Sequence, residues 1–257
     1  MKFFTTTIDE NGIAVLSYSR PPVNAFSNEA YAEFDQALLE LRRNSDVRVI
    51  ILYTPDKWFS VGNDVKAAGQ NPTYEMEQSN LAGIMSVEKR IKESPVPIIA
   101  AIRGYCIGAG LDFALNCDFI IASETAKITM PEMKVGILGG WGGILSKIVP
   151  ESMIRYMIYT SKAVSVTELE KYGSVFKVVP DDELLDSAKE LAKEITRNGP
   201  VAIRLARRCM NIYRDSGNED HRQYGEFLKE LYFDDHMDER LEAIQSFNEH
   251  REPNYRR

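Results

Sequence analysis

Three short stretches of the chain combine glycines with polar or acidic side chains in a way that could support chemistry on a carbonyl group. They are residues 58–65, 104–112 and 130–143. Glycine lets the backbone approach a ligand closely, and the free N–H groups at the start of a helix attract negative charge. Two such amides, from two turns, could polarise a carbonyl oxygen and stabilise an enolate.

Two acidic side chains stand in apolar surroundings within these stretches. Asp112 lies on the first turn of an apolar helix predicted over 111–117, and Glu132 ends a strand-like run. Apolar surroundings raise the pKa of a carboxyl group, which suits an acid or base working near neutral pH. The residues alone are equally compatible with purely structural roles, since Asp112 could favour the helix dipole and Glu132 could lie in a surface turn beside Lys134. Likewise, Gly62 fits a plain strand-to-helix turn as well as a ligand-binding one.

Other familiar catalytic and nucleotide-binding motifs are missing from the sequence. There is no G-x-S-x-G elbow, no G-x-G-x-x-G fingerprint and no P-loop. The three histidines, His221, His236 and His250, lie late in the chain, and none has a second His or Cys at ligand spacing. We therefore expect no metal site.

The glycine-rich stretches follow segments that read as buried strands. The run 47–54 is almost wholly apolar and rich in β-branched residues, as in a sheet that is covered on both faces. Asn11-Gly12 predicts a hairpin between the first two strands, and Ser27 is a candidate N-cap for a helix. The alternation of strand and helix predicts an α/β fold with right-handed crossovers. The predicted strands are 3–9, 13–19, 47–54, 96–102, 119–122 and 175–179, with helices from 27 and over 75–93.

The pattern changes after the last predicted strand. From Asp181 onward the sequence has no strand signals and predicts helices near 182–197, 200–215 and 220–248. We assign residues 1–195 to an α/β core and 196–257 to a C-terminal helical region. A helical region of about 60 residues has little core of its own, so we expect it to pack on the body or on another subunit.

Composition narrows the class of protein further. The chain has 257 residues and a net charge of −7, from 31 Lys and Arg against 38 Asp and Glu, which argues against nucleic acid or an acidic membrane as partner. Arg204, Arg207 and Arg208 form a local basic cluster, which we interpret as a solvated or intersubunit helix face rather than an RNA site. The N-terminal residues lack a signal-peptide pattern, and no apolar run reaches the roughly 20 residues of a membrane span. Three cysteines without paired spacing fit a reducing compartment, so we expect a cytoplasmic protein.

The order and spacing of the short motifs resemble the enoyl-CoA hydratase/isomerase (crotonase) superfamily along nearly the whole chain. Residues 20–26 resemble its RP…NA segment, and 59–64 resemble its FxAG-x-D turn. The remaining matches are 96–104 to PVIAAVNG, 108–114 to GGGCELA, 117–118 to CD, 131–136 to PEIxLG, and 166–173 to A-x-E-A…G-L.

This resemblance implies a crotonase-like spiral of ββα repeats whose C-terminal helices build homotrimers or dimers of trimers. The implied substrate is an acyl-CoA thioester, and CoA enters as part of it, so no separate cofactor is implied. Asn63 and Ala109 would supply the backbone N–H groups of an oxyanion hole, and Asp112 and Glu132 would be the catalytic carboxylates. The implied CoA-binding residues are Asn24, Ala25, Val61, Gly62, Asp64 and Val65, and Trp141 would line the acyl pocket.

Three departures from the family pattern affect the choice of reaction. Asp112 stands where hydratases usually have Glu, Ala109 stands where they usually have Gly, and Trp141 alters the following loop. We expect an enoyl-CoA hydratase, with Glu132 as proton donor and Asp112 holding the water. An isomerase using Glu132 alone, a thioester or C–C hydrolase, and a non-catalytic acyl-CoA or RNA-binding module are the alternatives.

Overall fold

The computed structural model describes residues 1–64, 73–132, 149–216 and 237–255, arranged around a six-stranded sheet. The strand order is β1-β2-β3-β4-β6-β9. β1 and β2 form the predicted antiparallel hairpin, and the other neighbours pair in parallel. The strands are β1 (Phe4–Ile8), β2 (Ile13–Tyr18), β3 (Val49–Tyr53), β4 (Ile98–Ile102), β6 (Phe119–Ser123) and β9 (Lys177–Val179).

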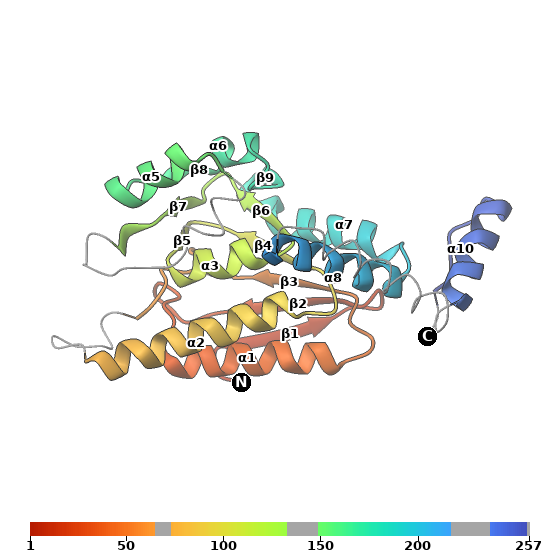
Figure 1. The fold of residues 1–257 in the computed structure, drawn as a ribbon, viewed down its shortest axis with the longest axis horizontal. Helices are drawn as coiled ribbons and strands as arrows, with labels where there is room; N and C mark the ends of the chain where they lie inside the picture. Colours follow the sequence, from red (N-terminus) through yellow and green to blue (C-terminus); the bar gives the residue numbers. More distant parts are fainter. Residues whose placement is uncertain (65–72, 133–148, 217–236, 256–257) are drawn as a thin grey trace.

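Helices cover both faces of this sheet, as the apolar strands required (Figure 1). One core lies between the sheet and α1 (Asn28–Arg43), α2 (Tyr74–Lys92) and α3 (Ala109–Asn116). A second core lies under α7 (Leu184–Thr196), which packs on β3, β4 and β6 and follows the 3-10 turn η2 (Asp181–Glu183). The predicted N-cap is confirmed, because the Ser27 side chain accepts a hydrogen bond from the N–H of Ala30.

A small second sheet stands at the end where the parallel strands finish. It contains β5 (Tyr105–Ile107), β7 (Lys127–Thr129) and β8 (Val164–Ser165), and α5 (Glu151–Thr160) and α6 (Val166–Lys171) lie beside it (Figure 1). Of these elements, only β7 coincides with a run that the sequence marked as strand-like. β5 has three residues between glycines, which is too short for a periodic pattern to develop.

The C-terminal region is helical within its described part. α8 (Pro200–Ser216) lies against the body, and α10 (Met237–Glu249) lies at one end of the molecule, where its Glu239 accepts hydrogen bonds from the start of α8 (Figure 1). The predicted helices 182–197 and 200–215 are confirmed, and 220–248 is confirmed from residue 237; residues 220–236 lie outside the described ranges. In the described ranges no helix has the length and apolar character needed to cross a bilayer.

Arg207, one residue of the expected basic cluster, is buried and holds two parts of the structure together. Arg207 is buried and forms an ion pair with Asp118, with 2.8 Å between Nε and Oδ2. Its remaining N–H groups donate to main-chain carbonyls of Ile91, Lys92 and Ser94. This corrects the interpretation of that position as part of an exposed face: Arg207 attaches α8 to the body, and only Arg204 and Arg208 remain exposed.

Candidate functional site

The first two glycine-bearing turns lie against one another, although more than 40 residues of chain separate them in the sequence. Ser60 forms a parallel bridge with Cys106 of β5, and the N–H of Ile107 donates to the Ser60 carbonyl at 3.0 Å. Gly62 has a positive φ of 82°, and a Cβ atom there would lie 3.3 Å from the amide nitrogen of Ala109. The structure therefore places the Asn63 and Ala109 turns side by side, at the end of the sheet where β3 and β4 finish.

Each turn presents an amide N–H without an acceptor among the described residues. Phe26 holds the first turn on both sides of Asn63, because its N–H donates to Gly62 O at 2.7 Å and its carbonyl accepts from Asp64 N at 2.9 Å. The N–H of Asn63 itself has no acceptor in this part of the chain. Ala109 begins α3, where the first N–H groups of a helix lack intrahelical partners, and Gly108 provides no side-chain cap. The arrangement can accept a developing oxyanion.

Asp112 lies one turn into α3, with 5% of its surface exposed. Burial raises its pKa to about 8, and the charges of Glu88 and Glu132 contribute to the same increase. An aspartic acid with such a pKa keeps its proton at neutral pH. Glu88 and Glu132 are thus the acidic groups whose charges act on Asp112.

Glu132 lies next to the second turn. A Cβ atom on Gly108, whose φ is 54°, would come within 3.0 Å of Glu132 Oε1, so a glycine there leaves room for the carboxylate. Glu132 Oε2 is buried and has no hydrogen-bond partner among the described residues. Burial raises the pKa of Glu132, and its own backbone N–H opposes this. An unpaired buried carboxylate oxygen beside two free amides is costly for folding and suits a substrate-binding site.

Two residues near this site were not predicted from the sequence. Glu88 of α2 is half-buried and has a pKa raised by burial, and its charge acts on Asp112. The signal that identifies it is its place on the apolar stripe of α2, four residues after Ile84 and three before Ile91. Tyr31 of α1 donates a hydrogen bond from its hydroxyl to Asn63 Oδ1. No local pattern predicts that contact, because it joins residues 32 positions apart.

Asn24 has a buried side chain that is used inside the protein. Its Nδ2 donates to Thr54 Oγ1 and to the Trp58 carbonyl, both at 2.8 Å, and its carbonyl accepts from Ser60 Oγ at 2.7 Å. Asn24 has a positive φ of 54°, which asparagine tolerates better than most residues. The side chain thus holds the segment before α1 against the first turn, and any contact of Asn24 with CoA would involve the main chain.

The other predicted CoA-binding residues lie around the same turn. Ala25 is buried and its carbonyl accepts from the Tyr18 hydroxyl at 2.7 Å. Asp64 forms an ion pair with Arg20 at 2.7 Å, and Val61 is half-buried beside Gly62. Val65, and Trp141 of the expected acyl pocket, lie outside the described residues.

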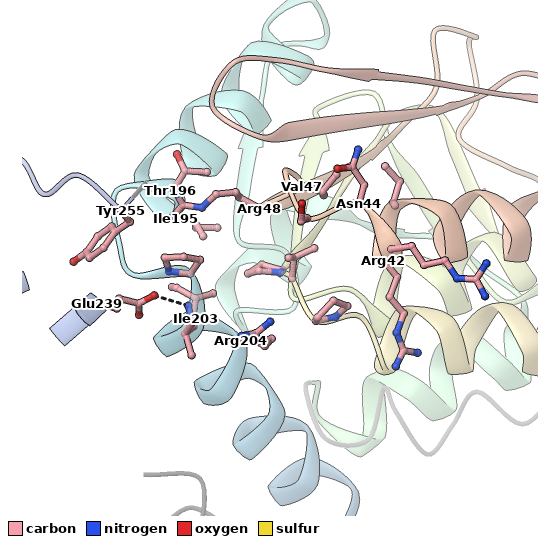
Figure 2. A pocket seen from close by; sticks show the side chains of 18 of the residues that line it. Arg42, Asn44, Val47, Arg48, Ile195, Thr196, Ile203, Arg204, Glu239 and Tyr255 are labelled. Carbon is pink, nitrogen blue, oxygen red and sulfur yellow. Dashed lines mark hydrogen bonds between the residues drawn. The ribbon is translucent and has the colours of Figure 1, made fainter. Parts of the chain in front are cut away.

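A cavity of about 530 Å³ occupies the opposite end of the parallel strands (Figure 2). Arg42, Arg48 and Arg204 line it, together with Glu239 of α10, which accepts the Val201 N–H of α8 at 2.9 Å. It contains none of the predicted site residues. Within the described ranges, no three His, Cys, Asp or Glu side chains come together as a metal site.

Comparison with known proteins places this chain among relatives that act on CoA esters. The family model described as Enoyl-CoA hydratase/isomerase matches residues 9–257. The chain is 33% identical over 254 residues to carnitinyl-CoA dehydratase of Salmonella enteritidis, covering 96% of each protein. It is 32% identical over 207 residues, 80% of each protein, to (7aS)-7a-methyl-1,5-dioxo-2,3,5,6,7,7a-hexahydro-1H-indene-carboxyl-CoA hydrolase of Rhodococcus jostii. The crystal structure of enoyl-CoA hydratase from Bacillus anthracis is similar with a TM-score of 0.88 and 29% identity, covering 98% of both chains.

Proposed function

Because the chain belongs to the enoyl-CoA hydratase/isomerase family, we propose that it adds water reversibly across the Cα–Cβ double bond of an acyl-CoA thioester. Membership of this family indicates an enzyme that acts on acyl-CoA. The choice of hydration over other reactions is our proposal. The observation that carries it is the pair of buried carboxylates, Asp112 and Glu132, beside the two unbonded amides of Asn63 and Ala109.

The two amides would bind the thioester oxygen while it becomes an enolate oxygen. Both N–H groups are fixed before the substrate arrives, so no reorganisation is needed as the charge develops. Removing one such donor typically costs about 3 kcal/mol of transition-state stabilisation. The methyl group of Ala109 leaves its amide intact, which supports a complete oxyanion hole despite the departure from glycine.

The carboxylates would share one proton, because two like charges in a desolvated site do not ionise together. Glu132 is the residue beside the Gly108 turn, so we place it near the α-carbon next to the thioester carbonyl. Asp112 then faces the β-carbon. In hydration, Glu132 delivers a proton to the α-carbon while Asp112 takes one from the attacking water, and the hydroxyl bonds to the β-carbon.

The resting protonation state fits the reverse direction, the elimination of water. Asp112 has a pKa of about 8 and holds the shared proton at neutral pH. Glu132 then acts as the base that removes the α-proton, and Asp112 protonates the departing hydroxyl. The similarity to a protein named a dehydratase supports this assignment.

Hydrolysis of a thioester or a carbon–carbon bond is the second candidate. The similarity to the Rhodococcus protein named a hydrolase supports it, and the oxyanion hole with one carboxylate to activate water would suffice. Isomerisation of the double bond would use Glu132 alone to move a proton between carbons, with Asp112 orienting it. The carboxylate pair favours hydration over both, since only hydration uses the two groups at once.

A homotrimer or a dimer of trimers remains our proposal for assembly. Supporting it, α10 carries exposed apolar side chains, of which Phe247 is 80% exposed and Leu241 59% exposed. An acidic chain with Arg207 buried offers little for nucleic acid, and absence of RNA retention on filters at low salt would agree with that.

An ultraviolet assay of a short trans-2-enoyl-CoA tests the proposed reaction. Wild type should remove the conjugated absorbance, and Glu132→Gln and Asp112→Asn should each lower kcat by about 100-fold or more, the scale of general acid–base catalysis. Glu170→Gln is the matched control, since Glu170 is a half-buried carboxylate that accepts the Val178 N–H at 2.8 Å, away from the site. Wild-type release of free CoA thiol would favour hydrolysis, and full turnover by either active-site variant would refute the assigned roles.

A further inference from the structure

Tyr31 is a buried tyrosine whose hydroxyl touches the oxyanion turn. Only 1% of its surface is exposed, and its hydroxyl donates a hydrogen bond to the side-chain oxygen of Asn63. Asn63 is also the residue whose main-chain N–H would bind the thioester oxygen. A single side chain of α1 is thereby connected to one half of the proposed oxyanion hole.

The ring of Tyr31 is held on several sides, so its hydroxyl has a fixed position. It stacks on Phe26 with 5.2 Å between ring centroids and meets Phe113 edge-on at 6.1 Å. On the α2 side Gly83 leaves it room, because a Cβ atom there would come within 2.7 Å of the ring. The main chain of Phe26 also bonds the turn on both sides of Asn63, so the residue whose ring packs on Tyr31 holds the turn as well.

Asn63 has few other hydrogen-bond partners in this turn. Gly62 N donates to Ser60 Oγ at 3.0 Å, and Asp64 is bonded through Phe26. The bond from Tyr31 is the one hydrogen bond that the Asn63 side chain forms among the described residues. The bond from Phe26 N–H to Gly62 O, at 2.7 Å, holds the peptide plane that carries the Asn63 N–H, and the Tyr31 bond holds the same residue from its side chain.

We propose that Tyr31 is a positioning residue for the oxyanion hole, holding the Asn63 side chain so that the Asn63 main-chain N–H points at the thioester oxygen. The inference rests on the proposed function of that amide. It applies equally to a hydratase, an isomerase or a hydrolase, because each passes through an oxyanion. The Tyr31 ring also meets Phe113, the residue that follows Asp112 in α3, so Tyr31 packs beside both parts of the site.

Acetoacetyl-CoA is a suitable probe because its enolate absorbs in the near ultraviolet and a formed oxyanion hole increases the enolate fraction without any turnover. We expect Tyr31→Phe to lower the affinity of the enolate form by about 10-fold, a part of the 100-fold or more that loss of a donor costs. Tyr18→Phe is the control, since Tyr18 is a buried tyrosine that stacks on the same Phe26 but whose hydroxyl bonds Ala25 O. It should keep the enolate signal of wild type.

A double-mutant cycle separates positioning from general loss of structure. In an Asn63→Ala background the hydroxyl of Tyr31 has no partner to hold, so adding Tyr31→Phe should change the enolate signal no further. An unchanged signal for Tyr31→Phe alone, or an additive loss in the double variant, would overturn the positioning role while leaving the proposed function intact. Absence of any enolate signal with wild type would overturn the oxyanion hole itself, and the role of Tyr31 with it.

Discussion

Replacing Glu88 with glutamine should move the alkaline limb of the pH–rate profile to lower pH. Burial first, and then the charges of Glu88 and Glu132, raise the pKa of Asp112 to about 8. Catalysis in either direction needs the proton that Asp112 and Glu132 share, so kcat/KM should fall as the pH rises through that pKa. Glutamine keeps the size of Glu88 and removes its negative charge, so Asp112 gives up its proton more easily.

The size of this change follows from the typical effect of one like charge on a carboxyl group. A like charge within about 6 Å typically changes a pKa by about one unit, which corresponds to roughly 1.4 kcal/mol. Glu88 is half-buried, so solvent weakens its effect only in part, and Lys92 on the same helix favours its charged form. Burial of Asp112 is unchanged in the variant. We therefore expect the alkaline limb to move from about pH 8 to about pH 7.

Initial rates of water elimination from a short 3-hydroxyacyl-CoA, measured from acidic to alkaline pH, show where the limb lies. Glu93→Gln is the matched control, because it removes one negative charge five residues further along, on an exposed side chain that faces Arg42. Its limb should coincide with that of wild type. If kcat/KM of Glu88→Gln fell at the same pH as that of wild type, or at a higher pH, the effect of the Glu88 charge on Asp112 would be refuted.

Three further predictions concern the cost of building the site and of attaching the C-terminal region. Gly108→Ala should lower the free energy of unfolding by about 1–3 kcal/mol and abolish most activity, because it adds backbone strain at a positive φ and a Cβ atom 3.0 Å from Glu132 Oε1. Gly173 also has a positive φ, but no atom lies within 4 Å of an added Cβ. Gly173→Ala should therefore show the effect of backbone strain alone in urea denaturation. Asp112→Asn should raise the free energy of unfolding by about 5 kcal/mol at pH 8, from about four pKa units at roughly 1.4 kcal/mol each. The folded-state pKa of Asp112 is raised, so the stability of wild type falls between pH 3.8 and about 8, and thermal melts at pH 4 and pH 8 should show the gain only at pH 8. Arg207→Met should cost about 3–5 kcal/mol, because it removes the cation beside Asp118 and the donors to three main-chain carbonyls. Exposed Arg204→Met should cost under about 0.5 kcal/mol, and equal melting curves for the two variants would contradict the attachment of α8.

The main sheet and its covering helices were predictable from local sequence patterns. The run 47–54 forms a strand because its apolar β-branched residues suit a sheet buried on both faces, and Ser27 caps α1 at the expected residue. The small sheet was not predictable, because β5 and β8 have only three and two residues and depend on pairing with β7. Short strands acquire their structure from neighbours distant in sequence.

The candidate site was predictable where one stretch of chain contains the whole signal. The turn at Gly62 and the start of α3 each combine glycine with the end of a buried strand, and Asp112 is a lone acid among apolar residues. Tyr31 and Glu88 were not found, because they act on residues distant in sequence: Tyr31 bonds Asn63 in the first turn, and the charge of Glu88 acts on Asp112 of α3. For Asn24, whose CoA contact stays a prediction, the motif did not show that the side chain is buried and bonds Thr54 and the Trp58 carbonyl.

Incubation of a trans-2-enoyl-CoA with the protein in water labelled with heavy oxygen, followed by mass spectrometry, tests the proposed reaction most directly. The account predicts a 3-hydroxyacyl-CoA that carries one labelled oxygen on its β-carbon, formed by wild type and lost in Glu132→Gln. Labelled free acid with released CoA, or an unlabelled product whose double bond has moved, would contradict the assignment of Asp112 and Glu132 to the addition and removal of water.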